Sequence, residues 1–204
     1  MDYQFIYSGP LLFKSTLNEE DKLALLKICL KHKRIKYNEK LAGVITDEYR
    51  IEDLNSLKNI LRPYLENFME AVNNWYGLSQ KQLTLITAWT NFMKPGEFNP
   101  PHTHSNCNFS SVFYLKVSNK IIKEGAKHVG TGSRPGNINF MFGPPVDGYI
   151  AMYDHAPKEG DFFIFPNTLI HNVHPFKTKN AARISMAINF DVRDSIQASD
   201  YVKN

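Results

Sequence analysis

The segment Arg183-Ile184-Ser185-Met186-Ala187-Ile188-Asn189-Phe190-Asp191-Val192 (RISMAINFDV) alternates between apolar and polar or small side chains. Successive side chains of a β-strand point to opposite faces, so the alternation predicts a strand with two different faces. The apolar face carries Ile184, Met186, Ile188, Phe190 and Val192, and the other face carries Arg183, Ser185, Ala187 and Asn189. The apolar face needs a packing partner, for which helices are expected. The polar face either meets water or lines a cavity that needs a charge.

Short runs of aromatic and β-branched residues precede this strand and predict a mainly β chain. They occupy residues 82–93, 109–117, 137–142, 149–153 and 161–165, and turn residues separate them. Apolar residues at helical spacing predict helices over 19–34 and 51–77, the second kinked or split at Pro63. Helices followed by strands indicate an α+β fold, mainly β. We expect an antiparallel sandwich or jelly roll with the N-terminal helices packed on one outer sheet face.

Length and composition fit one folded domain. The chain has 204 residues, 43% hydrophobic and 22% charged, so 1–204 is expected to be a single domain. Residues 1–80 would form a helical support region, 81–194 the β core and 195–204 a C-terminal tail. The net charge of +4 and one short basic run, 31–34, give no clear nucleic-acid signal. There is no apolar run of membrane-spanning length and no signal peptide, and two cysteines make no disulfide framework, so a cytoplasmic location is expected.

Two histidines stand one residue apart in the segment 98–106 (FNPPHTHSN), directly after two prolines. Side chains at positions i and i+2 of a strand point to the same side, so His102 and His104 can bind one ion. His171 follows the strand predicted over 161–165 and can complete a three-ligand site that leaves iron positions open for substrate and oxygen. The alternative is an exposed polar loop, and the histidine pair alone does not choose between these readings.

Four segments, taken in order, extend this pattern. They are 96–104, 110–115, 160–175 and Arg183-x-Ser185, and they span about half of the chain. Their glycine and histidine spacing is similar to cupin motifs, although the glutamate expected after the histidine pair is absent. The set more closely resembles the 2-oxoglutarate/Fe(II)-dependent oxygenases, especially prolyl-hydroxylase-like members and a branch that carries His-x-His. The resemblance implies a double-stranded β-helix (a jelly-roll or cupin-like barrel) that uses Fe(II), 2-oxoglutarate and O2.

The resemblance also implies roles for individual residues. His102, His104 and His171 would bind the metal and form the catalytic centre, with His104 at the place where most members carry Asp or Glu. Asp147, Asp154 or Asp161 could supply a carboxylate instead, but His104 is favoured. Arg183 would pair with the distal carboxylate of 2-oxoglutarate, because a guanidinium matches a carboxylate bidentately. The other cosubstrate contacts would come from Ser185, Tyr114 and Asn91.

The function expected from these residues is a dioxygenase, most simply a hydroxylase that releases succinate and CO2. Its substrate, a small molecule or a protein side chain, is not indicated, and neither is the oligomeric state. One alternative is a cupin-type metal-dependent dioxygenase or isomerase that does not use 2-oxoglutarate. Another is a non-catalytic jelly-roll binding module. The segment 120–134 is expected to be a mobile loop or a lid over substrate. His128 and His155 are expected in solvated loops, and His174 at the surface or beside the ligands.

Overall fold

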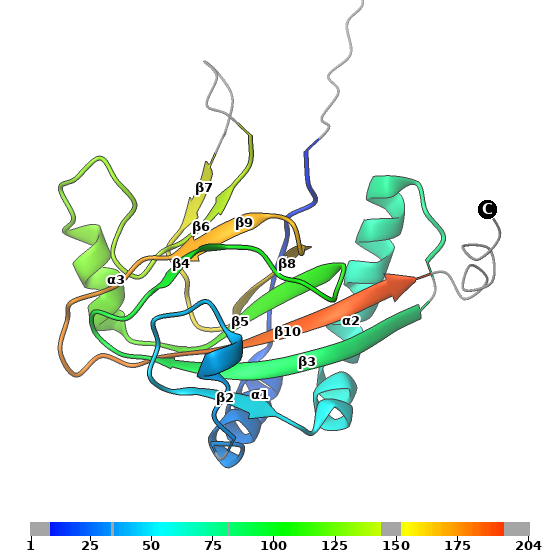
Figure 1. The fold of residues 1–204 in the computed structure, drawn as a ribbon, viewed down its shortest axis with the longest axis horizontal. Helices are drawn as coiled ribbons and strands as arrows, with labels where there is room; N and C mark the ends of the chain where they lie inside the picture. The colour runs from blue at the N-terminus through cyan, green and yellow to red at the C-terminus, as the bar shows by residue number, and fades with distance from the viewer. Residues whose placement is uncertain (1–8, 34, 81, 144–151, 194–204) are drawn as a thin grey trace, which may run out of the picture.

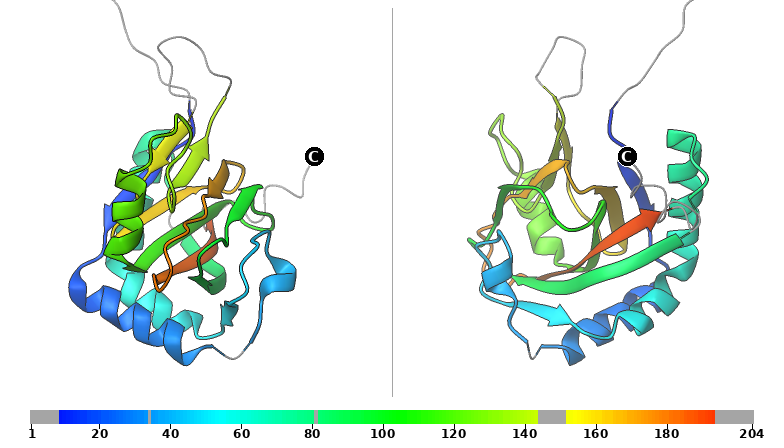
Figure 2. Two further views of the ribbon diagram at one scale, coloured as in Figure 1. Left: turned by 90° about the vertical axis from the view of Figure 1, so that its left-hand side faces the viewer. Right: turned by 45° about the vertical axis from the view of Figure 1, so that its right-hand side comes forward.

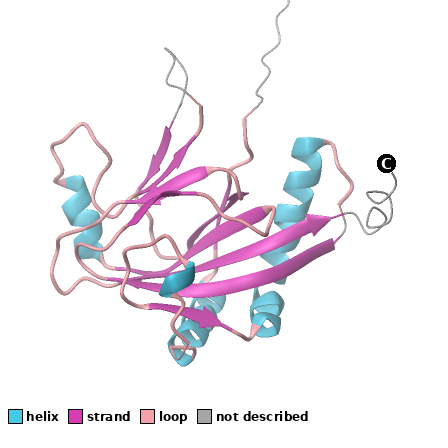
Figure 3. Cartoon of the chain, viewed as in Figure 1, coloured by secondary structure: helices cyan, strands magenta, loops and turns pink. Residues whose placement is uncertain are grey.

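Two antiparallel β-sheets face each other in the computed structural model of the chain, and two helices cover the outer side of the larger sheet (Figures 1 and 3). The structure describes residues 9–33, 35–80, 82–143 and 152–193. The larger sheet has the strand order β1-β8-β5-β10-β3-β2, and the smaller sheet has the order β4-β9-β6-β7. The strands are β1 (Phe13–Thr16), β2 (Glu48–Ile51), β3 (Gln82–Met93), β4 (Asn99–His102), β5 (Phe109–Val117), β6 (Ile138–Met141), β7 (Met152–His155), β8 (Asp161–Pro166), β9 (Ile170–Val173) and β10 (Arg183–Arg193). The helices are α1 (Glu19–Lys31), α2 (Leu54–Tyr76), α3 (Asn119–Ala126) and a 3-10 turn, η1 (Asn38–Lys40).

Strand β10 lies between β5 and β3 in the larger sheet, and its two faces differ as the alternation predicts. Met186, Ile188 and Phe190 belong to the hydrophobic core beneath α1 and α2. The opposite face points between the two sheets, where Arg183, Ser185, Ala187 and Asn189 line a cavity. The cavity alternative is therefore the one that the structure adopts.

The two N-terminal helices begin at side-chain caps and bury one face against the larger sheet. Asn18 Oδ1 accepts a hydrogen bond from the Asp21 N–H at 2.8 Å, and Asp53 Oδ1 accepts one from the Ser56 N–H at 3.0 Å. Each cap satisfies a backbone donor that the first helical turn leaves unpaired. Figure 2 shows α1 and α2 on the side of the larger sheet that faces away from the smaller one. Phe68 of α2 is fully buried there and packs edge-on against Phe109 and Phe190.

Several boundaries differ from the sequence expectations. Helix α2 is one continuous element with Pro63 inside it, so of the two expected outcomes the split is wrong and the kink stays a prediction. Pro63 and Asn59 are exposed, and water can satisfy the Asn59 carbonyl that loses its intrahelical donor. Ile51, expected in the helix, is the last residue of β2. Of the strand expected over 149–153, residues 149–151 lie outside the described part of the chain, and β7 covers Met152–His155.

The segment expected to be a loop or lid over 120–134 contains helix α3 instead. Ser118 caps this helix, and Ile121 on its inner face is 4% exposed and packs into the second core cluster. No residue of 120–134 is among those that line the cavity below β10. A role as a lid over substrate stays a prediction. The first part of the segment is a helix held by core packing that its basic, glycine-containing sequence does not reveal.

The paired sheets with helices on one outer face form a double-stranded β-helix, which confirms the expected fold class. Gly160 lies in a turn of this β-helix, and its φ of +87° is a conformation that glycine adopts without steric cost. Its N–H donates to the Tyr114 carbonyl at 2.8 Å, and its carbonyl accepts from the Leu17 N–H at 2.9 Å. Among the described residues, no helix is both long and apolar enough to span a bilayer.

Candidate active site

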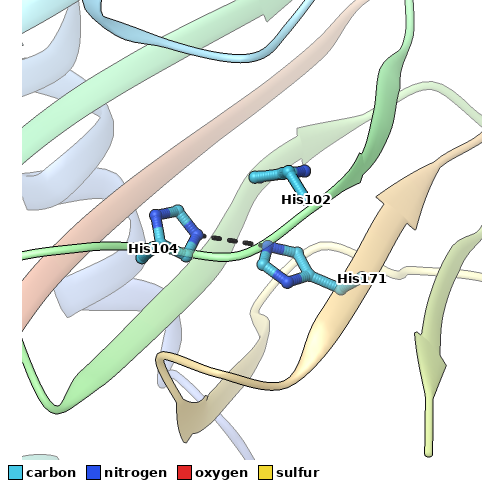
Figure 4. A group of neighbouring side chains, drawn as sticks. All are labelled: His102, His104 and His171. Atoms are coloured by element: carbon cyan, nitrogen blue, oxygen red, sulfur yellow. Dashed lines mark hydrogen bonds between the residues drawn. The ribbon is translucent and has the colours of Figure 1, made fainter.

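The three histidines singled out by the sequence lie together (Figure 4) and line the cavity between the sheets. His102 ends β4 and is the register partner of His171 in β9. His104 is not on a strand, contrary to the expectation of an i, i+2 pair on one strand, but follows β4 in a loop. Its backbone N–H donates to the Asn167 carbonyl at 2.9 Å, and Asn167 Nδ2 donates to the His104 carbonyl at 3.1 Å. This reciprocal pair of hydrogen bonds holds the loop against the turn before β9.

The three imidazoles converge on one point. Their ligand nitrogens lie within 4.8 Å of one another, and His104 Nε2 is 3.2 Å from His171 Nε2. The Nδ1 atoms of two rings are engaged with backbone carbonyls, at 2.8 Å for His102 with Pro100 and 2.9 Å for His171 with Leu169. A carbonyl at Nδ1 holds the proton there and leaves Nε2 with its lone pair, which is how metal-binding histidines are oriented.

Burial keeps these rings neutral. Desolvation lowers the pKa of His104 to about 4, lowers the pKa of His102, and lowers the pKa of His171 well below its ordinary value. A neutral imidazole is the form that binds a metal ion. Three neutral nitrogen donors with a shared focus suit a divalent first-row metal such as iron. The donor set therefore fits Fe(II), with one negative charge fewer than a site made of two histidines and a carboxylate.

A cavity of about 430 Å3 extends from the histidines between the two sheets. Its floor is the inward face of β10 and β3, where Arg183, Ser185 and Asn91 lie, and its outer wall is the segment 37–45. Asn91 and Ser185 are register partners on neighbouring strands, and Ser185 is in turn opposite Tyr114 of β5. Asn91, Ser185 and Tyr114, three of the four residues expected to contact 2-oxoglutarate, thus form one row across the sheet. The fourth, Arg183, lies two residues before Ser185 on β10 and also lines the cavity.

Arg183 is a buried cation without a carboxylate partner among the described residues. It is 3% exposed, its Nη1 donates to the Gly136 carbonyl at 2.7 Å, and its Nη2 donates to the Tyr114 hydroxyl at 3.2 Å. Its Nε is buried and has no partner within the part of the chain that the structure describes. Desolvation lowers the pKa of the guanidinium, and desolvation also raises the pKa of Tyr114 to about 12, so this phenol keeps its proton. A buried guanidinium with an unused donor fits the carboxylate of 2-oxoglutarate.

Tyr114 is completely buried and belongs to the core cluster around the smaller sheet. Its ring lies 5.0 Å from the Arg183 guanidinium carbon, and it is not among the residues that line the cavity. It therefore supports the guanidinium from behind. The expectation that its hydroxyl meets 2-oxoglutarate directly stays a prediction.

The carboxylates considered as alternative metal ligands are engaged elsewhere or lie outside the described chain. Asp161 Oδ2 accepts from His155 Nε2 at 2.8 Å and from the Lys158 N–H at 3.0 Å, so His155 is a partly buried hydrogen-bond partner at the end of β7 and not a solvated loop residue. Asp154 Oδ2 accepts from Asn137 Nδ2 at 2.6 Å. Asp147 lies outside the described residues.

The remaining histidines lie away from the triad. His174 contacts the side chains of Asn139 and Asn172 at 2.9 Å, and His128 is exposed in a loop. Neither belongs to the cluster of possible metal ligands.

The cavity residues that escaped the sequence analysis include Tyr37, Glu48 and Trp89. Trp89 lies within the strand expected over 82–93, but its neighbour across the sheet could not be known. Glu48 belongs to a four-residue strand in which only one register places its side chain beside Asn91. No local pattern marks such a residue, because its position depends on the pairing of β2 with β3.

Comparison with known proteins places this site in a family. Residues 87–189 match the model of a family described as 2OG-Fe(II) oxygenase. No curated protein sequence matches the chain. Similar solved structures include a prolyl-4-hydroxylase of Pseudomonas putida, with 17% identity, a TM-score of 0.55, and coverage of 90% of this chain and 92% of the other.

Two further structures have the same fold. The viral collagen prolyl hydroxylase vCPH of Paramecium Bursaria Chlorella virus-1, in a 2OG complex, is 12% identical with a TM-score of 0.56, and covers 88% of this chain and 94% of its own. HygX of Streptomyces hygroscopicus, with nickel, 2-oxoglutarate and hygromycin B bound, is 12% identical with a TM-score of 0.53, and covers 92% and 84%. At these identities the likeness shows the fold, whereas the family match covers half of the chain. This protein therefore belongs to the 2OG-Fe(II) oxygenase family and is an enzyme that uses Fe(II), 2-oxoglutarate and O2.

Proposed function

We propose that the enzyme hydroxylates a C–H bond of a small molecule or a protein side chain. One oxygen atom of O2 would enter the substrate as a hydroxyl group, and the other would enter succinate as 2-oxoglutarate loses CO2. Two proteins of similar structure, the prolyl hydroxylases of Pseudomonas putida and of the chlorella virus, support hydroxylation as the reaction. The observation that carries the proposal is the shared cavity, which is lined by three converging imidazoles and has a buried guanidinium with a free donor at its floor.

The proposed roles follow from the contacts described above. His102, His104 and His171 hold the metal through their Nε2 atoms, which the backbone carbonyls at Nδ1 leave available for two of the rings. Bound Fe(II) supplies the redox and Lewis-acid chemistry that O2 activation requires. Arg183 binds the distal carboxylate of 2-oxoglutarate, with Ser185 and Asn91 as polar neighbours and Tyr114 holding the guanidinium in place.

Aromatic side chains surround two of the three histidine rings. Phe165 and Phe140 pack at 4.6 Å and 6.1 Å from the His171 ring, measured between ring centroids, and Trp89 lies 5.8 Å from His104. Arg183 is itself 3% exposed, and burial strengthens its interaction with a bound carboxylate because the local dielectric constant is low.

An anaerobic titration tests the proposal. Adding 2-oxoglutarate to the Fe(II)-loaded protein is expected to produce the weak visible charge-transfer band of a chelated oxo-acid. His171→Ala is expected to lose iron and therefore the charge-transfer band. In air, the wild-type protein is expected to form succinate and the His171→Ala variant is not. A protein that retains iron but shows neither the band nor succinate would contradict the proposal. A cupin-type reaction without 2-oxoglutarate would then be the better interpretation.

We further propose that the chain acts as one domain in the cytoplasm. The helices and both sheets share continuous core clusters, in agreement with one folding unit over the described residues. Cys29 and Cys107 are free thiols, and burial raises the pKa of Cys29 to about 12 and that of Cys107 to about 11. Protonated thiols of this kind persist in a reducing compartment. Limited proteolysis and fractionation of source cells would test these two proposals.

A further inference from the structure

Glu48 is a buried acid that the proposed chemistry does not use. Its side chain lies in the wall of the same cavity as the histidines and Arg183, and the residue is 1% exposed. The contact recorded for its carboxylate is a long one, 3.5 Å from Asn38 Nδ2 to Oε2. No Lys, Arg or His forms an ion pair with it among the described residues. Burial of a carboxylate is costly unless a cation or several hydrogen-bond donors contact it. Glu48 is therefore a candidate for binding a ligand that supplies them.

Apart from the Asn38 amide group, two amide oxygens lie near Glu48. Asn91, its register partner on β3, has a buried Oδ1 without a partner in the described part of the chain. Asn99 Oδ1 also points to this wall. A side chain placed on Gly43 would collide with Asn99 Oδ1 and come within 3.1 Å of Glu48 Oε1, so both oxygens lie at the same short stretch of backbone. A group with several N–H donors would satisfy these oxygens together.

Two aromatic rings connect this wall to the histidines. Tyr37 and Trp89 both line the cavity, with 6.2 Å between their ring centroids, and Trp89 lies 5.8 Å from the His104 ring. The faces of Trp and Tyr attract cations, most strongly where water is excluded. A carboxylate, amide oxygens and aromatic faces together are the features that recognise an ammonium or guanidinium group.

Arg183 does not form an ion pair with the Glu48 carboxylate. Glu48 is on β2 and Arg183 on β10, with β3 between them, so roughly 10 Å of sheet separates the two strands. Two lysines lie near this wall. Lys36 Nζ is bound to Asp47 Oδ1 at 2.8 Å and to the Thr46 carbonyl at 2.7 Å. Lys40 lines the cavity but is exposed, and it forms no ion pair with Glu48 among the described residues. Desolvation, followed by the neighbouring Glu97 carboxylate, raises the pKa of Glu48 to about 7, and Lys36 acts weakly in the opposite direction. The cavity therefore has a basic site and a separate acidic site.

We propose that Glu48 binds a cationic nitrogen of the substrate, an aliphatic ammonium or guanidinium group, while Arg183 binds 2-oxoglutarate in the same cavity. This inference rests on the function proposed above and names the substrate class: the enzyme oxidises a basic compound or a basic side chain. The aromatic pair lies between the acid and the metal ligands, so a short aliphatic chain would run from the charged nitrogen past Trp89 towards His104.

Calorimetric titration with simple probes tests this assignment. Pentylamine and agmatine are the cationic probes, and pentan-1-ol is the neutral probe of similar shape. Wild-type protein is expected to bind each cation at least about tenfold more tightly than pentan-1-ol. Glu48→Gln is expected to abolish that preference, because it removes the charge and keeps the shape. Glu39→Gln, which removes an exposed carboxylate from the neighbouring 3-10 turn, is expected to keep it.

The outcomes separate this inference from the proposed function. A wild-type protein that shows the 2-oxoglutarate charge-transfer band but binds pentan-1-ol as tightly as pentylamine would overturn the role of Glu48 alone. Equal cation affinity in wild type and Glu48→Gln would do the same. Loss of the band with a persisting, Glu48-dependent cation preference would instead overturn the proposed oxygenase site. If Glu48→Gln does not fold, Tyr37→Leu is the second variant, and an unchanged preference for cations there would contradict the proposal.

Discussion

Replacing Arg183 by Met is expected to weaken 2-oxoglutarate binding while leaving iron binding intact. Methionine keeps an unbranched, apolar stem in the buried site and removes only the cation and its donors. The free Nε and the two Nη groups around a bound carboxylate would no longer be present. Leaving a buried carboxylate without its charged partner costs about 2–5 kcal/mol, which corresponds to a loss of affinity of about 30-fold to several thousand-fold.

Ligand-induced stabilisation gives the assay a defined size. At a 2-oxoglutarate concentration 100 times the wild-type Kd, binding adds about 2.7 kcal/mol to the free energy of unfolding. A 100-fold weaker variant gains about 0.4 kcal/mol at the same concentration. For a chain of this length, about 1 kcal/mol shifts Tm by roughly 2–4 °C. The wild-type Tm should therefore rise by about 5–11 °C with 2-oxoglutarate, and the Arg183→Met Tm by about 1–2 °C.

Two controls make the result interpretable. Arg193→Met removes an arginine from the exposed end of the same strand, where it pairs with Asp191, and should retain the full rise in Tm. Iron content after equilibrium dialysis should be the same in all three proteins, because Arg183 is not among the possible metal ligands. In the absence of ligand, relief of the buried cation opposes the loss of two hydrogen bonds, so Tm should change by only a few degrees. A full rise in Tm in Arg183→Met would refute the assignment of 2-oxoglutarate to this guanidinium.

Three other predictions address the metal, the buried acid and the long helix. His104→Leu should lower the Fe(II) affinity measured by equilibrium dialysis at least about 100-fold. His174→Leu, which replaces a histidine outside the triad, should lower it less than about threefold. Equal Fe(II) affinity in the two variants would exclude His104 as a ligand. Glu48 has its pKa raised from 4.5 to about 7, so the folded protein holds a proton that the unfolded chain releases. The free energy of unfolding of the wild type should therefore fall by about 3 kcal/mol relative to that of Glu48→Gln as pH rises from 4.5 to above 7. Urea denaturation at several pH values measures this difference. If the free energies of unfolding of the two proteins change with pH in parallel, the burial argument is contradicted. Pro63→Ala should raise the free energy of unfolding by about 2 kcal/mol, because it restores a backbone donor inside α2, and a lower Tm would show that the proline is needed there.

Local patterns in the sequence predicted the elements whose physics is local. Strands β3 and β5 have the expected bounds, because a run of aromatic and β-branched residues between turn residues favours a strand. The two faces of β10 were predicted from the alternation of its side chains. The segments around His102, His171 and Arg183 resembled an oxygenase family, and the family match confirms that resemblance.

Some short elements were not predictable in this way, although the four-residue β6 lies within the strand predicted over 137–142. Strands β1 and β2 have four residues each and exist because neighbouring strands supply their hydrogen-bond partners. Helix α3 is held by Ile121 in the core, a contact that its basic sequence does not show. A four-residue strand or a one-sided helix of eight residues has too little periodicity to compete with a loop interpretation.

The sequence by itself determined the residue types available for chemistry and the faces of the longer strands. Only the tertiary structure decided that His104 reaches the other two imidazoles from a loop, that Arg183 has no carboxylate partner among the described residues, and that Glu48 shares their cavity. The physical reason is that a strand's pattern is set by its own backbone geometry, whereas convergence of side chains depends on which distant strands pair and in which register. The charged groups of the cavity likewise depend on the tertiary structure. An unpaired charged group is buried, and its desolvation costs free energy, only after the two sheets have packed together.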